Sequence, residues 1–158
     1  MTHNNIDRVE AVENLFPIDG PHTPETLIAA SQAIAELWRY LGHATISGTR
    51  KILTDPADAY TMVGALAAAE RSSVDVLERL STWARNIGDE STYTDRFGHD
   101  DPDGTRDQIQ SNCHLIAGYL RDITNNHEVA AQRLDMAQSG LGHLYRDADD
   151  DDLSVTPE

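Results

Sequence analysis

Apolar residues recur every three to four positions in each long segment of this 158-residue chain. Such a repeat places them on one face of an α-helix, which completes a turn in about 3.6 residues. No segment alternates apolar and polar residues for long, and no Asn-Gly or Asp-Gly pair lies between two strand-like runs. We therefore predict an all-α fold, a bundle of five or six helices.

Two helix starts are marked by a capping side chain followed by proline, at Thr23–Pro24 and at Asp55–Pro56. The capping oxygen accepts a bond from a free backbone N–H, and proline fits the first helical position because it has no N–H of its own. A short helix over 5–16 precedes these two. Another helix is expected to begin at Asp103 or Thr105.

Glycine, serine and asparagine positions predict where these helices end. Gly42 and Gly88 follow the last apolar residue of their repeats and are expected to terminate them. Between Pro56 and Gly88, Ser72–Ser73 leaves two alternatives: one long helix, or a break at which a serine caps a new helix. We favour the break. Asn125–Asn126 either interrupts the last helical segment or lies on the exposed side of one long helix.

The chain is expected to form one main domain. Residues 1–22 hold the short helix and a loop rich in proline and glycine, and residues 23–146 form the helical bundle. A chain of this size can bury a substantial core. Residues 147–158 carry six acidic residues and little apolar content. We predict that this C-terminal tail is disordered.

The charge balance excludes several functions. The chain has 12 Lys and Arg against 27 Asp and Glu, a formal net charge of −15. Direct binding to nucleic acid is disfavoured, because phosphate contacts need basic side chains. No apolar run is long enough to cross a membrane, and the N-terminus does not resemble a signal peptide. A single cysteine forms no internal disulfide. We expect a cytoplasmic protein that does not bind membranes.

Metal and catalytic signatures are weak. The seven histidines are scattered, and Cys113 and His114 are adjacent, so they point about 100° apart on a helix. There is no Gly-x-Ser-x-Gly turn for a nucleophilic serine. Cys113 is interpreted as a small core residue. We therefore predict no catalytic residues, no metal, no cofactor and no enzymatic activity.

One acidic run partly matches a calcium-binding EF-hand loop. With Gly104 at the invariant turn, Asp101, Asp103 and Asp107 fall on ligand positions. The first ligand would then be His99 and the bidentate glutamate would be replaced by a glutamine, so two strong oxygen donors are missing. We interpret this run as an acidic loop that caps the following helix.

Tyr145-Arg146-Asp147-Ala148-Asp149 fits a Tyr-x-x-x-Asp pattern after a helix. It resembles the export signal of substrates of the mycobacterial-type secretion system. The Trp-x-Gly turn of the small substrates of that system is missing, because Trp83 is followed by Ala84 and Arg85. Since an Asp-rich tail satisfies so short a pattern by chance, secretion is kept only as an alternative.

A broader resemblance rests on two stretches. These are Ala35-Glu36-Leu37-Trp38-Arg39-Tyr40-Leu41-Gly42-His43-Ala44-Thr45 and Tyr60-Thr61-Met62-Val63-Gly64-Ala65-Leu66, the second followed by alanines, a turn and a helix ending near Trp83. Together they resemble a group of small, uncharacterised helical proteins of high-GC actinobacteria. The resemblance covers the middle third of the chain. It implies a helical domain in a bacterial cytoplasm and no particular activity.

The apolar repeats are more numerous than a single layer of helices can cover. We therefore predict a non-catalytic interaction module that forms a homodimer and docks an unidentified protein partner. The expected dimer surface is either the C-terminal helix or the alanine-rich run 64–69. An alternative is an acidic inhibitor that mimics nucleic acid and binds a DNA- or RNA-binding protein. The candidate interaction residues are Trp38, Tyr60, Gly64, Trp83, Tyr119 and Leu141.

Overall fold

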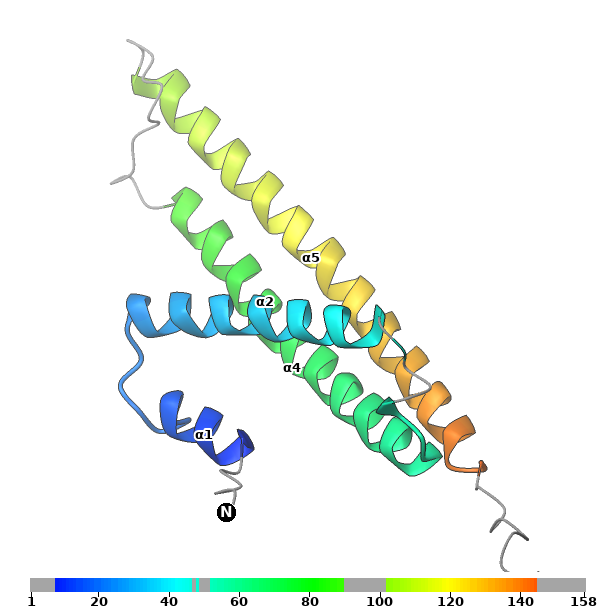
Figure 1. Cartoon of the computed structure of the whole chain (residues 1–158). Helices are drawn as coiled ribbons and strands as arrows, with labels where there is room; N and C mark the ends of the chain where they lie inside the picture. The colour runs from blue at the N-terminus through cyan, green and yellow to red at the C-terminus, as the bar shows by residue number, and fades with distance from the viewer. Residues whose placement is uncertain (1–7, 47, 49–51, 90–101, 145–158) are drawn as a thin grey trace, which may run out of the picture. The chain divides into compact units, whose positions relative to one another are not determined.

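A computed structural model describes residues 8–46, 48, 52–89 and 102–144 of the chain. Over this part the protein is all-α, as predicted, with no strand. The four helices that it contains are α1 (Arg8–Leu15), α2 (Pro24–Ile46), α4 (Pro56–Asp89) and α5 (Pro102–Leu141), shown in Figure 1. The chain divides into two units, Met1–Ile52 and Leu53–Glu158.

The first unit contains α1 and α2. Helix α2 begins where the sequence predicts, because the caps are reciprocal: the N–H of Thr26 donates to Oγ1 of Thr23 at 3.2 Å, and the N–H of Thr23 donates to Oγ1 of Thr26 at 2.9 Å. The carboxyl of Glu25 in the first turn accepts hydrogen bonds from the backbone N–H of Glu25 and from the Thr23 hydroxyl. These bonds hold the pKa of the Glu25 carboxyl below its ordinary value.

The predicted end of α2 at Gly42 is wrong, because the helix continues to Ile46. The hydroxyl of Thr45 donates to the carbonyl oxygens of Leu41 and Gly42, at 2.8 Å and 3.1 Å. A helical glycine costs only about 1 kcal/mol relative to alanine, so Gly42 alone does not stop a helix whose apolar repeat goes on. Neither α1 nor α2 buries a residue.

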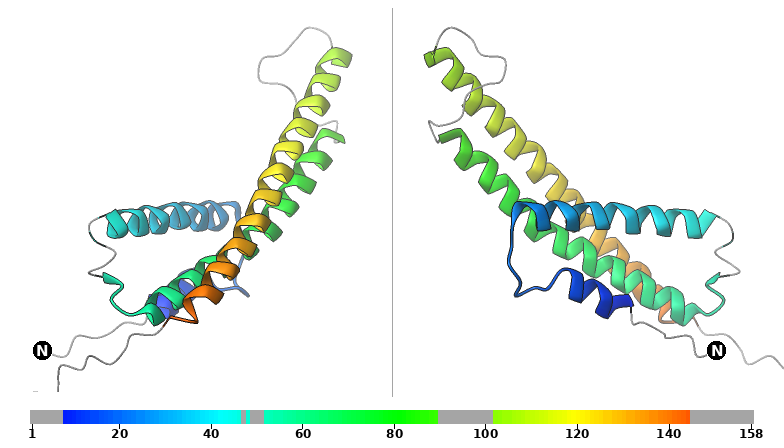
Figure 2. Two further views of the ribbon diagram at one scale, coloured as in Figure 1. Left: turned by 90° about the vertical axis from the view of Figure 1, so that its right-hand side faces the viewer. Right: turned by 60° about the vertical axis from the view of Figure 1, so that its left-hand side comes forward.

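The second unit is a hairpin of two long helices, α4 and α5, which lie side by side in antiparallel directions in all views of Figures 1 and 2. Helix α4 begins at the predicted cap, where Oδ1 of Asp55 accepts from the N–H of Ala57 at 2.9 Å. Helix α5 begins at Pro102, within a residue of the prediction, and ends at Leu141. The N–H of Gly142 then donates to the Gln138 carbonyl.

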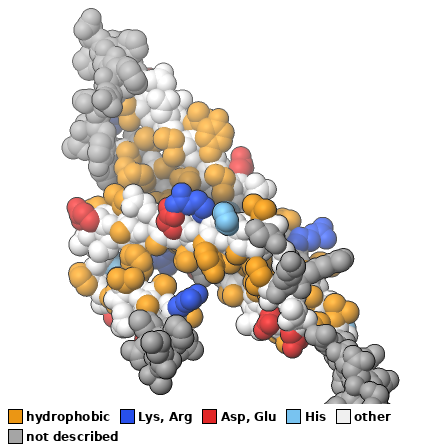
Figure 3. All heavy atoms as spheres, viewed as in Figure 1, with side chains coloured by type: hydrophobic (Ala, Val, Ile, Leu, Met, Phe, Trp, Pro, Cys, Tyr) orange, Lys and Arg blue, Asp and Glu red, His pale blue; other side chains and the backbone are white. Residues whose placement is uncertain are grey.

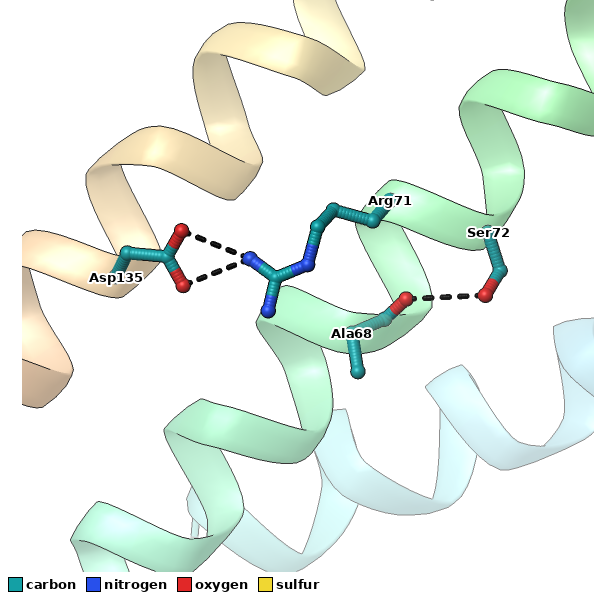
Figure 4. Close-up of polar contacts among 4 residues, drawn as sticks. All are labelled: Ala68, Arg71, Ser72 and Asp135. Carbon is teal, nitrogen blue, oxygen red and sulfur yellow. Dashed lines mark hydrogen bonds and ion pairs between the residues drawn. The ribbon is translucent and has the colours of Figure 1, made fainter.

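The predicted break at Ser72–Ser73 is wrong, because α4 runs unbroken through it. The Ser72 hydroxyl donates to the carbonyl of Ala68 at 3.1 Å (Figure 4), and the Ser73 hydroxyl donates to the carbonyl of Glu70 at 2.6 Å. Both hydroxyls therefore bond back to the preceding turn and do not cap a new helix. Asn125–Asn126 does not interrupt α5, because both residues lie on the exposed side of one long helix.

Candidate protein-binding face

The two helices of the hairpin meet along a line of residues that we call the seam. Its members are half-buried or buried, except Tyr60 at the end, and they are spaced alternately by three and four residues. On α4 they are Tyr60, Val63, Ala67, Glu70, Val74, Leu77, Ser81 and Ala84. On α5 they are Gln110, Cys113, Ala117, Leu120, Thr124, His127, Ala131, Leu134, Gln138 and Leu141. This spacing, 3.5 residues on average, is that of an antiparallel coiled coil.

The most deeply buried seam residues are small. They are Ala67, Ser81, Ala84, Cys113, Ala117, Thr124 and Ala131. Small side chains allow two helix backbones to approach closely. The closeness is visible at Ser81, whose hydroxyl reaches across and donates to the backbone carbonyl of Ala117 at 2.9 Å. Cys113 is buried in the seam, so its interpretation as a small core residue is consistent with its position.

Polar contacts between side chains also tie the two helices together. Nδ1 of His127 contacts Oε2 of Glu70 inside the seam. Nη1 of Arg71 donates to both carboxylate oxygens of Asp135 at 2.8 Å, as Figure 4 shows. Because both of these side chains are about half exposed, solvent screens the pair. Such contacts fix the register of the helices more than they stabilise them.

The residues that follow each seam position form the polar face of the hairpin. Two shallow grooves there are lined from both helices, one by Arg71, Glu128, Gln132 and Asp135 beside the seam, the other by Glu78, Arg85, Arg121 and Asn125 among others. Each groove contains both arginine and carboxylate side chains. The polar face therefore does not present the continuous line of carboxylates that a nucleic-acid mimic needs.

The residues that precede each seam position form what we call the apolar face. Because both helices are right-handed and run antiparallel, these positions lie on the same side of the hairpin, opposite the polar face. On α4 they are Ala59, Met62, Leu66, Ala69, Ser73, Val76, Leu80 and Trp83, and Ile87 continues this repeat by one step beyond the last seam residue. On α5 they are Ile109, Asn112, Ile116, Tyr119, Ile123, Asn126, Ala130, Arg133, Ala137 and Gly140. Hydrophobic side chains gather over α4 and α5 in Figure 3.

Six large side chains of the apolar face are strongly exposed. Trp83 and Tyr119 are each 60% exposed. The other four are Val76, Leu80, Ile116 and Ile123. Exposed contiguous apolar surface of this kind marks interaction sites on soluble proteins. Sequence reasoning missed that the face is separate from the seam, although the signal, a second repeat displaced by one residue, is present in the sequence.

The structure separates the six predicted interaction residues into three places. Trp38 lies on α2 and is 48% exposed. Trp83 and Tyr119 share the apolar face. Tyr60, Gly64 and Leu141 gather at the end of the hairpin where α4 begins. Leu141 is half-buried in the seam. The Gln138 amide donates to the Tyr60 carbonyl at 3.4 Å, and a Cβ on Gly64 would collide with the same amide.

Part of the alanine-rich run 64–69, which the sequence offers as a dimer surface, packs between α4 and α5 of the hairpin itself. Ala67 is fully buried in the seam. Gly64 faces Gln138 of α5. Of this run, Leu66 and Ala69 remain on the apolar face.

The other sequence motifs yield no site. Gly104, Asp107 and Gln110 lie within helix α5, so they do not form a calcium-binding loop. Among the described residues, no three His, Cys, Asp or Glu side chains are placed to hold a metal ion. No helix in this part of the chain combines the length and apolar character of a membrane span. The tail 147–158 and the motif Tyr145–Asp149 lie outside the described residues.

Comparison of the chain with protein-family models, with curated proteins and with solved structures finds no match. The inference of function therefore rests on the geometry of the hairpin.

Proposed function

We propose that this chain is a helical protein–protein interaction module that associates with itself through the apolar face of the α4–α5 hairpin. The observation that carries the proposal is the cluster of six large, exposed apolar side chains on that face. Burying apolar surface contributes about 25 cal/mol per Å², so such a cluster favours association strongly. In keeping with the resemblance to actinobacterial proteins, the module acts in a bacterial cytoplasm and has no catalytic role.

The distribution of charge supports association through this face. The two hairpin helices contain ten acidic residues and six arginines, a net charge of −4 against −15 for the whole chain. None of the ten acidic residues occupies a position of the apolar face, whose one charged member is Arg133. Most of the repulsion between two copies therefore originates away from this surface, and salt screens it beyond about 8 Å at physiological ionic strength.

Light scattering coupled to size exclusion, at moderate salt, tests the proposal. We expect a molar mass near twice the 17.4 kDa of one chain. The double variant Trp83→Glu/Tyr119→Glu should be monomeric, because it places two charges where the second copy would bury them.

The matched control is Thr82→Glu/His114→Glu. Both residues are exposed on the polar face, one on each helix. This control adds the same charge and should remain dimeric. A wild-type mass near 17.4 kDa across micromolar concentrations, or loss of the dimer in the control as well, would overturn the proposal.

A further inference from the structure

The contacts across the seam define the register of the hairpin. Tyr60 is opposite Gln138, Glu70 is opposite His127, and Ser81 is opposite Ala117. Residues that face one another therefore have numbers that add to about 198. The middle of the paired region lies at residue 73 on α4 and at residue 125 on α5. It divides the apolar face into a half near the α4–α5 connection, the loop half, and a half near the start of α4, the open half.

The two halves carry side chains of different size. The loop half holds all six of the large exposed residues: Val76, Leu80 and Trp83 from α4, and Ile116, Tyr119 and Ile123 from α5. In the open half, α5 presents only Ala130, Arg133, Ala137 and Gly140, and α4 presents Ala59, Met62, Leu66 and Ala69. Along α5 the apolar face is thus raised in the loop half and low in the open half, whereas α4 carries large apolar side chains in both halves.

We propose that two copies pack apolar face against apolar face with their hairpins antiparallel, so that the loop half of each copy covers the open half of the other. This inference rests on the proposed self-association and adds its orientation. Helix α5 then lies over α5 of the second copy, where large side chains meet small ones, as close packing at native density requires. Helix α4 lies over α4, where Trp83 and Leu80 meet the apolar side chains of Met62 and Leu66. In the opposite orientation, loop half over loop half, a two-fold axis along the hairpins places α4 over α5 of the second copy. Trp83 would then meet Ile116 and Leu80 would meet Tyr119, so large side chains would face large ones along the whole loop half.

A second copy fits the dimensions of the face better than a single helix does. Helix α4 has 34 residues, which corresponds to about 50 Å. Two helices packed at the usual spacing make the face roughly 18 Å wide, so its area is on the order of 900 Å², close to the roughly 800 Å² per partner of a stable complex. A single helix covers only part of this width. A second hairpin matches both length and width and completes a four-helix bundle.

Two polar residues of the apolar face suit this arrangement. Asn126 is exposed and lies near the middle of α5, next to the two-fold axis that relates the copies. Its amide would pair with the same amide of the second copy, and a single such pair is known to fix orientation in coiled coils. Arg133 in the open half would lie over the ring of Tyr119 from the second copy, a favourable cation–π contact.

Crosslinking distinguishes the two orientations. Both cysteine variants are made in a Cys113→Ala background and treated with a short bismaleimide. Asn126→Cys lies beside the two-fold axis, so it should crosslink efficiently to its own copy. Ile87→Cys lies at the loop end, 14 residues from the middle of α4, so its two copies would be about 40 Å apart and should not crosslink.

The outcomes separate this inference from the proposed function. Crosslinking at position 126 and none at 87, with a dimeric mass, supports the antiparallel arrangement. A dimeric mass with crosslinking at position 87, alone or together with position 126, or with crosslinking at neither site, overturns the arrangement while leaving self-association intact. A monomeric mass overturns both proposals. The apolar face would then be covered by another segment of the same chain or by a different protein.

Discussion

In the hairpin the buried seam holds small side chains at its deepest positions and the exposed apolar face holds large ones, which is the reverse of the usual distribution of side-chain size between interior and surface. The seam, which the chain buries by itself, contains mostly alanine, serine, threonine and cysteine at its deepest positions. The apolar face carries tryptophan, tyrosine, isoleucine and leucine, and these are exposed. Small residues bring two backbones together but bury little apolar area, whereas large residues supply area and need a partner. If the proposed self-association holds, the hairpin keeps its shape with one surface and associates through the other.

The largest effect is expected from Ala67→Leu, which forces a large side chain into a fully buried seam position. Overpacking of this kind costs about 3 kcal/mol of unfolding free energy, and it pushes the helices apart. Urea unfolding followed by circular dichroism measures the loss. The control Ala68→Leu adds the same group at an exposed position of the same turn and should change stability by less than about 0.5 kcal/mol. Equal losses in both would mean that the seam is not tightly packed.

The second prediction compares two truncations. Leu77→Ala in the half-buried seam should cost about 2 kcal/mol, near the lower limit for a core leucine. Trp83→Ala removes a larger side chain from the apolar face. At low protein concentration it should nevertheless change the free energy of unfolding by no more than about 0.5 kcal/mol. Thermal and urea unfolding at two protein concentrations test this. If Trp83→Ala were as damaging as Leu77→Ala at every concentration, Trp83 would belong to the folded core of the single chain.

The third prediction concerns the hydroxyl that bridges the helices. Ser81→Ala removes the bond to the Ala117 carbonyl and leaves the seam otherwise unchanged. A buried hydrogen bond of this type contributes about 1 kcal/mol. Ser72→Ala is the control, because its hydroxyl bonds only within α4. Urea midpoints that shift equally for the two variants would show that the interhelical bond contributes nothing of its own.

The last comparison is between two glycine replacements outside the seam, of which Gly64→Ala is expected to have the smallest effect of all. Gly118→Ala places its new methyl group in open space, so it should raise the unfolding free energy by about 1 kcal/mol through helix propensity. Gly64→Ala must first displace the Gln138 amide, and its gain should be about half as large. The difference in melting temperature between the two variants measures how firmly Gln138 is held. A larger gain for Gly64→Ala would contradict the close contact there.

Sequence reasoning predicted the parts of the fold that depend on local chemistry. The starts at Pro24 and Pro56 follow from caps within three residues of each, and the all-α class follows from the apolar repeat. The helix ends were harder to predict, because Gly42 and Ser72–Ser73 are only mildly unfavourable within a helix. Packing along a seam that continues past the serines outweighs their preference for a cap.

The candidate site was predicted only in part. Trp83 and Tyr119 were identified by their size and their place on apolar repeats, and both lie on the apolar face. What the sequence does not reveal is which of two adjacent repeats the hairpin covers, because both have the same spacing. Large apolar side chains generally favour the interior, but the most deeply buried positions of the seam hold small ones, and at Ser81 the hydroxyl reaches the backbone of Ala117. That choice depends on how closely the helices approach, which is a tertiary property.

The displacement of the apolar face by one residue from the seam has a consequence for genetics. In a scan of all single substitutions, selection for folding alone would show intolerance at positions such as Ala67, Ser81 and Ala117, where almost every mutation enlarges the side chain. Selection for function would add a second set of sensitive positions, each immediately before one of the first. The two selections together would therefore resolve, codon by codon, which side chains build the molecule and which ones it presents to others.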